Sequence, residues 1–117
     1  MSEYTGTFTV LNNTGATITS VVVTHYTTDY GPNTFRAASL AESAASSPTP
    51  LKASTSNKDR WSVAFITGSD QLLTGQENCG FESEDANGNV RVILNPEDWD
   101  IYMPKSSSCT DNDYNQT

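Results

Sequence analysis

Apolar side chains in this chain of 117 residues recur at every second position, in short runs that turn-forming residues separate. Phe8 and Val10, for example, alternate with threonines, and residues 17–26 are rich in β-branched side chains. A period of two residues is typical of strands that bury one face and expose the other. The clearest runs cover residues 5–11, 17–26, 61–65, 89–94 and 98–103. The pattern therefore predicts an all-β fold.

Turn signals between the runs predict how they connect. Asn12 to Gly15 has the composition of a turn and would join the first two runs in an antiparallel hairpin. Asn87-Gly88 predicts a second hairpin, because a type I′ turn needs positive φ at both central residues. In the last run, three side chains are expected to point into the core: Trp99, Ile101 and Met103.

The spacing of runs and turns predicts a single antiparallel β-sandwich of about seven to eight short strands. Pro48 and Pro50 lack backbone N–H donors, so a central strand cannot pass through that stretch. A chain of this length fits one domain. We expect the sandwich to cover residues 1–105, with residues 106–117 as a polar C-terminal tail that Cys109 could tie down.

The charge of the chain makes nucleic acids unsuitable partners. Fourteen acidic residues against six basic ones give a net charge of −8. Such a surface repels the phosphate backbone of nucleic acids.

The first residues, MSEYTGTFTV, have neither the basic nor the apolar region of a secretory signal, and no apolar run is long enough for a transmembrane segment. We therefore expect a cytoplasmic protein, or one exported by an unconventional route.

The two cysteines leave their redox state open. A bridge between Cys79 and Cys109 would stabilise the fold by roughly 3.5 kcal/mol on the chain-entropy estimate. In a reducing cytosol the same residues would be two separate thiols.

Residues with catalytic or metal-binding chemistry are present but do not form a recognisable set. His25 is the only histidine, and we expect it on the surface or rim of a sheet. Asp98 and Asp100 share a strand face at a separation that a glycosidase pair permits, but a small sandwich offers no obvious deep cleft. Residues 85–89 and 111–113 carry oxygen ligands without the remaining features of a calcium loop. We therefore expect no enzyme activity, no metal and no cofactor.

Aromatic residues beside acids and amides at loop ends point to ligand binding. Protein sites for sugars combine an aromatic face with carboxylate and amide oxygens that bind hydroxyls. Trp99 is expected in the core, which leaves tyrosines as rim candidates. The candidate ligand-binding residues are Tyr26, Asp29, Tyr30, Asn95, Asp98, Asp100 and Tyr102.

Several segments resemble the PUD-type domain family, nematode proteins that rise in long-lived insulin-signalling mutants and that have fungal and bacterial relatives. The segments are TGTFTVLNNTGATITSVVVTH, KDRWSVAFI, the stretch from Cys79 to Leu94 and MPKSSSC. The resemblance covers roughly Tyr4 to Cys109 and consists of strand patterns. It implies a compact β-sandwich similar to the aegerolysins, small fungal proteins that bind particular membrane lipids and can serve pore-forming partners.

The resemblance implies no catalytic residues, and it makes a homodimer an expected assembly because the nematode members pair with one another. Many members have a longer, glycine- and aromatic-rich loop where this chain has LKASTSNKD, residues 51–59, which puts any ligand binding through that loop in doubt.

Three functions from different classes follow from these observations. The leading hypothesis is a non-enzymatic, lectin-like protein that binds glycans in recognition or defence. The alternatives are a module that recognises lipid head groups and a structural module that dimerises. Exposed tyrosines around a concavity would favour the first, and an exposed Trp61 or Trp99 would favour the second. A flat apolar face would favour the third.

Overall fold

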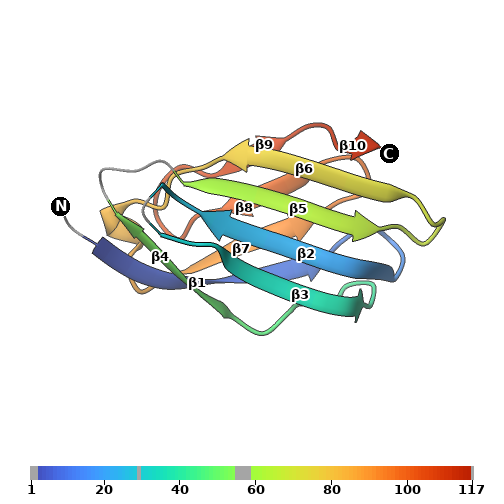
Figure 1. Ribbon diagram of the computed structural model, residues 1–117, viewed down its shortest axis with the longest axis horizontal. Helices are drawn as coiled ribbons and strands as arrows, with labels where there is room; N and C mark the ends of the chain where they lie inside the picture. Colours follow the sequence, from blue (N-terminus) through green and yellow to red (C-terminus); the bar gives the residue numbers. More distant parts are fainter. Residues whose placement is uncertain (1–2, 29, 55–58, 117) are drawn as a thin grey trace.

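The computed structural model describes residues 3–28, 30–54 and 59–116 and confirms the predicted all-β sandwich. Two five-stranded sheets stack face to face, as Figure 1 shows. The order in the first sheet is β4 (Thr49–Ser54), β1 (Glu3–Asn12), β7 (Asn89–Leu94), β8 (Trp99–Tyr102) and β9 (Cys109–Asp111). The order in the second is β10 (Asn115–Gln116), β6 (Leu72–Asn78), β5 (Arg60–Ile66), β2 (Ile18–Tyr26) and β3 (Asn33–Leu40).

The core lies between the two sheets and consists of the inward positions that the alternation predicts. Trp61, Val63 and Phe65 on β5 are at most 3% exposed. Trp99 and Ile101 on β8 are completely buried, and Met103 is 7% exposed. The ring centroids of Phe8 on β1 and Trp61 on β5 lie 5.5 Å apart in an edge-to-face arrangement, so aromatic side chains from the two sheets pack against each other in the core.

The predicted hairpin between the first two runs is wrong, because β1 and β2 belong to different sheets. Instead, β1 pairs antiparallel with β4 and parallel with β7. The buried side chain of Asn12 holds the crossing between the layers: its Nδ2 donates to the carbonyl oxygens of Ala16 (2.8 Å) and Leu40 (2.9 Å). Its Oδ1 accepts the backbone N–H of Thr14 at 3.0 Å. A turn composition alone cannot separate such a crossing from a hairpin.

The Asn87-Gly88 hairpin is also wrong, although Asn87 does have positive φ (66°). A 3-10 turn, Ser83–Asp85, precedes it, and no paired strand does. Asn87 N–H donates to the carbonyl oxygen of Thr5 at 2.7 Å, and Gly88 accepts from Thr7 N–H at 3.1 Å. The dipeptide therefore docks onto β1 and starts β7, whose true hairpin partner is β8.

The C-terminal segment, residues 106–117, contributes an edge strand to each sheet. β9 pairs with β8, and β10 pairs with β6. Cys79 and Cys109 form a disulfide that links the end of β6 to the start of β9. β4, which contains Pro50, is an edge strand, as expected for a segment with a missing N–H donor.

Candidate functional site

The sequence-predicted ligand residues do not converge on one site. The molecule is 45 Å long. Tyr26 ends β2 beside the start of β5, at the same end as the start of β1. Asn95 and Asp98 lie in the β7–β8 loop at the opposite end, which is the right-hand side of Figure 1. Tyr102 lies at the far end of β8 from that loop, and Asp29 lies outside the described residues.

Tyr30 takes part in a surface cluster with two charged residues. Its hydroxyl donates to a carboxylate oxygen of Glu3 at 3.0 Å. The ammonium of Lys52 lies 3.2 Å from the same carboxylate and 5.0 Å from the centre of the Tyr30 ring. The hydrogen bond from Tyr30 and the nearby Lys52 lower the pKa of Glu3. These contacts account for the three side chains without a ligand.

The acids and amide near β8 also bind one another. Asn95 Nδ2 donates to Asp98 Oδ1 at 2.8 Å and to Asp100 Oδ2 at 2.9 Å. Thr110 Oγ1 donates to the other oxygen of Asp100 at 2.6 Å. The two carboxylates are therefore bridged by one amide, which fixes the shape of the β7–β8 loop. Tyr102, 38% exposed, packs against the guanidinium of Arg91 on the neighbouring strand.

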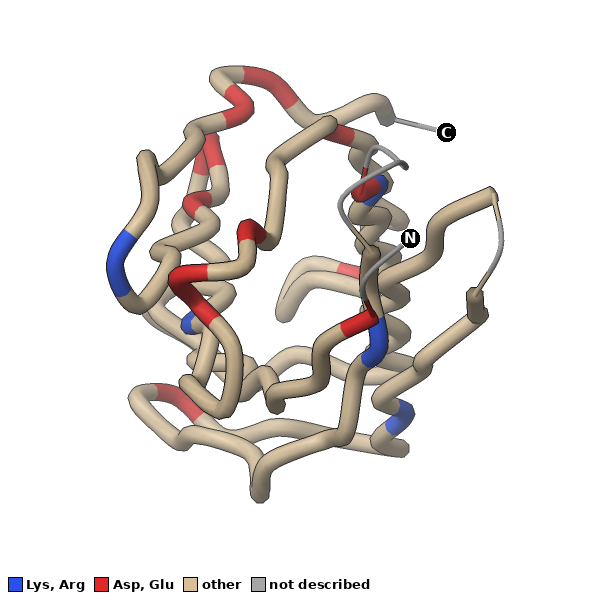
Figure 2. The backbone as a smooth tube through the Cα atoms, turned by 90° about the vertical axis from the view of Figure 1, so that its left-hand side faces the viewer, with Lys and Arg blue, Asp and Glu red and all other residues tan. Residues whose placement is uncertain are grey.

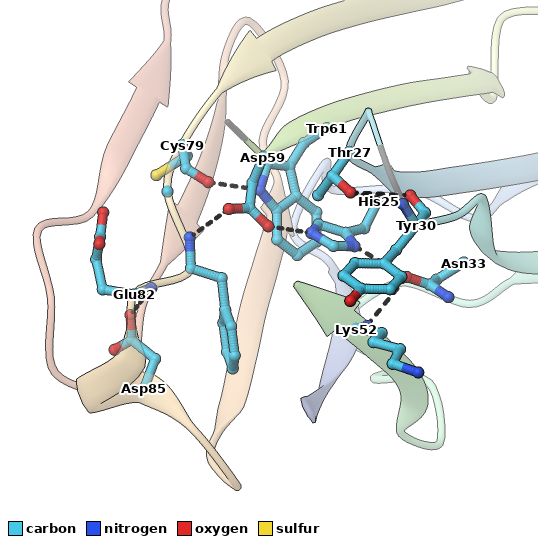
Figure 3. A network of polar contacts seen from close by, with 12 residues as sticks. His25, Thr27, Tyr30, Asn33, Lys52, Asp59, Trp61, Cys79, Glu82 and Asp85 are labelled. Atoms are coloured by element: carbon cyan, nitrogen blue, oxygen red, sulfur yellow. Dashed lines mark hydrogen bonds and ion pairs between the residues drawn. The ribbon is translucent and has the colours of Figure 1, made fainter. Parts of the chain in front are cut away.

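His25 is completely buried, so the expectation of a surface or rim position is wrong. As Figure 3 shows, its Nε2 contacts Asp59 Oδ2. Its Nδ1 lies 3.0 Å from Asn33 Oδ1, and this oxygen also accepts the backbone N–H of Lys52 at 3.3 Å. Because the Asn33 atom is thus an acceptor, Nδ1 of His25 carries a proton and donates it.

The remaining atoms of this network are satisfied as well. Asp59 Oδ1 accepts the N–H of Phe81 at 3.0 Å, and the indole N–H of Trp61 donates to the carbonyl of Cys79 at 2.9 Å. The rings of Trp61 and His25 pack with centroids 4.6 Å apart. Among the described residues, no buried side-chain nitrogen or oxygen lacks a hydrogen-bond partner. We assign the network a structural role.

A second buried acid, Asp85, closes the loop before β7 (Figure 3). Its oxygens accept the N–H groups of Glu82, Lys105 and Ser106 at 2.8–2.9 Å and the Ser106 hydroxyl at 2.5 Å. Burial alone would raise the pKa of Asp85, but these four hydrogen bonds outweigh it and lower the pKa. The carboxylate of the calcium-like stretch 85–89 is therefore occupied by protein donors.

An open hollow of about 850 Å³, lined by described residues, lies at the end of the sandwich where four loops meet. These loops connect β1–β2, β5–β6, β7–β8 and β9–β10, and the strand registers bring them to the same end. We call this concavity the loop-end hollow. It is lined by Thr14, Ala16, Phe65, Thr67, Gly68, Ser69, Gln71, Leu73, Pro96, Glu97, Asn112, Asp113 and Tyr114.

The lining of the loop-end hollow is mainly polar, and its one partly exposed aromatic side chain, Tyr114, is fixed by contacts with neighbouring residues. The Tyr114 hydroxyl lies 2.9 Å from the carbonyl oxygen of Asn95 and 2.7 Å from that of Asp98. Its ring packs edge-to-face on Phe65 at 5.3 Å between centroids. Burial raises the pKa of the Tyr114 phenol, which therefore stays protonated and donates. Asn95 and Asp98, which the sequence predicts as ligand-binding residues, thus support the hollow through their backbone carbonyl groups.

Sequence reasoning missed most of the residues of this hollow. The sequence predicts no more than a weak calcium site from Asn112 and Asp113, and it predicts that Tyr114 lies in a polar C-terminal tail. For the buried His25, which lies outside this hollow, the sequence does contain a signal. Val21, Val23 and His25 share the inward phase of β2, so the alternation itself indicates a buried histidine.

The acidic charge of the protein and the placement of its metal-ligating side chains limit which ligands it can bind. Acidic residues outnumber basic ones and are spread over several separate segments of the chain in Figure 2. In residues 3–28, 30–54 and 59–116, no group of three or more histidine, cysteine or acidic side chains is placed to hold a metal ion. The same part of the chain contains no helix that is long and apolar enough to cross a membrane.

A scan against protein-family models finds no match to this chain, and a search of curated proteins finds no significant match. The resemblance to the PUD-type family therefore remains a prediction from the sequence.

Proposed function

We propose that this protein is a non-enzymatic glycan-binding protein and that its binding site is the loop-end hollow. The observation that supports the proposal is the lining: hydroxyl, amide and carboxylate groups of Thr67, Ser69, Gln71, Asn112 and Asp113 surround the partly exposed Tyr114. Sugars present many hydroxyls and one apolar face, so they suit a concavity with this mixture of oxygens, amides and an aromatic ring.

The alternatives have less support among the described residues. Lipid recognition would gain support from an exposed indole ring at the membrane interface, but Trp61 and Trp99 are both completely buried. Dimerisation through an apolar face would need a cluster of exposed apolar side chains. Within the described part of the chain, the exposed large apolar residues are Leu72 and Tyr102, which lie on different sheets.

The test is a broad glycan array with the purified, untagged protein, followed by competition with the free sugar. We expect reproducible binding to one related set of sugars. Alanine substitutions at Gln71 and Asn112 should weaken this binding at least tenfold, because each side chain can exchange two hydrogen bonds with hydroxyls.

The matched control is Tyr102→Ala, which removes an exposed tyrosine of the original candidate set outside the hollow. Binding that survives Q71A and N112A but disappears with Y102A would move the site to the outer face of the first sheet. A blank array would refute the glycan-binding function and shift attention to lipid vesicles and to self-association.

A further inference from the structure

The charge of the loop-end hollow is one-sided. Glu97 and Asp113 line it and are exposed, and no lysine or arginine of the described residues joins them there. Within the described part of the chain, neither carboxylate takes part in an ion pair or a side-chain hydrogen bond. Both are therefore available to a ligand that enters the hollow.

Two more carboxylates belong to the segments that carry and contact Tyr114, and neither forms an ion pair within the described part of the chain. Asp98 Oδ1 accepts a hydrogen bond from the neutral Asn95 amide. Asp111 Oδ2 accepts one from the neutral indole N–H of Trp99 at 2.9 Å. Burial raises the pKa of the Tyr114 phenol, and the negative charges of Asp98 and Asp111 raise it further.

We propose that the loop-end hollow selects saccharides that carry free amino groups over their N-acetylated and their acidic counterparts. This inference rests on the proposed glycan-binding function and names the class of sugar. An ammonium group on the sugar ring can pair with Glu97 or Asp113 at the rim. The N-acetylated sugar has the same ring and hydroxyls, but its acetamido group carries no charge. A sugar with a carboxylate or sulfate group is repelled by the carboxylates of Glu97 and Asp113.

The size of the preference follows from the exposure of the two carboxylates. Pairs in contact with water contribute little each and are screened by salt. We therefore expect the amino form to bind about three- to tenfold more tightly than the N-acetyl form at low salt. The ratio should fall toward one as the ionic strength rises to about 0.5 M.

The experiment measures the affinity of the full chain for three probes by titration calorimetry: a glucosamine tetramer, the matching N-acetylglucosamine tetramer and a glucuronate oligomer. The expected order is amino, then N-acetyl, with no detectable binding of the glucuronate. The double variant E97Q/D113N should remove most of the difference between the first two probes. Glu84→Gln, which removes one exposed negative charge outside the hollow, should leave the difference unchanged.

The outcomes separate the inference from the function on which it rests. If the N-acetyl tetramer binds as well as the amino form, and Q71A still weakens it, the glycan-binding site stands and the charge selection is refuted. An equal loss of preference in E84Q and in E97Q/D113N would show only the effect of net charge, and would also refute it. If no probe or array glycan binds, both proposals fall together.

Discussion

Replacing Asp59 with alanine should destabilise the fold more than any other single change to a polar side chain of the buried network. The substitution removes the carboxylate that contacts His25 Nε2 and the oxygen that accepts Phe81 N–H. Leaving the buried ring nitrogen of His25 without its partner costs about 1–3 kcal/mol. An unsatisfied buried N–H adds about 1–3 kcal/mol. A total of about 2–6 kcal/mol is a large part of the stability of a small domain.

Urea unfolding measures this loss. With a slope of about 1–2 kcal/mol per molar urea, the midpoint for D59A should fall by about 1 M or more. The control is Asp59→Asn, whose amide can offer its oxygen to Phe81 and an N–H to His25 Nε2. We expect D59N to lose only about 1–2 kcal/mol, because every buried polar atom keeps a partner. A loss below about 1 kcal/mol for D59A, or equal losses for both variants, would refute the account of the network.

Three further predictions concern the packing of the C-terminal edge and the loop before β7. Gly75→Ala would place a Cβ 2.5 Å from the indole nitrogen of Trp99, so we expect a loss of about 1–3 kcal/mol, measured as a lower unfolding midpoint. The pKa of Asp85 is lowered in the folded state from its ordinary value near 3.8, so its stabilising effect is present above that value and is lost as the pH falls through the folded pKa. In D85N the fall of the unfolding free energy at acid pH should therefore be less steep than in the unchanged protein. The same acid dependence in both proteins would refute a structural role of the carboxylate. Reduction of the Cys79–Cys109 bridge should lower the unfolding free energy by about 3.5 kcal/mol, and a Cys79→Ser/Cys109→Ser variant should show the same loss without sensitivity to reductant.

The strands and the core could be predicted from the sequence to a large extent, because burial follows the alternation directly. Trp61, Val63 and Phe65 point inward as the period of two requires. The pairing of strands could not be predicted. β1 has an equally good composition for a hairpin with β2 and for its observed pairing with β7, and the choice depends on contacts of Asn12 that are distant in sequence.

The candidate site was harder to predict because its residues come from four separate loops. Thr67, Ser69, Gln71 and Asn112 are ordinary surface types, and only the strand directions bring them together. The segment that carries Tyr114 contains strands of three and two residues, which are too short and polar for a periodic signal. Its position depends on the disulfide and on the contacts of Tyr114, neither of which the alternation reports.

The parallel pairing of β1 with β7 also has a consequence for how the protein is made. Residues 7–12 must wait for residues 89–94 before the middle of the first sheet can form. β2, β3, β5 and β6 pair with one another through residues 18–78 and need nothing from β7. During synthesis the second sheet can therefore assemble first, while β1 keeps one edge open until residues 89–94 have emerged. Contacts this far apart in sequence slow folding, and an open strand edge is a site for aggregation, so the nascent chain is most vulnerable to aggregation at β1.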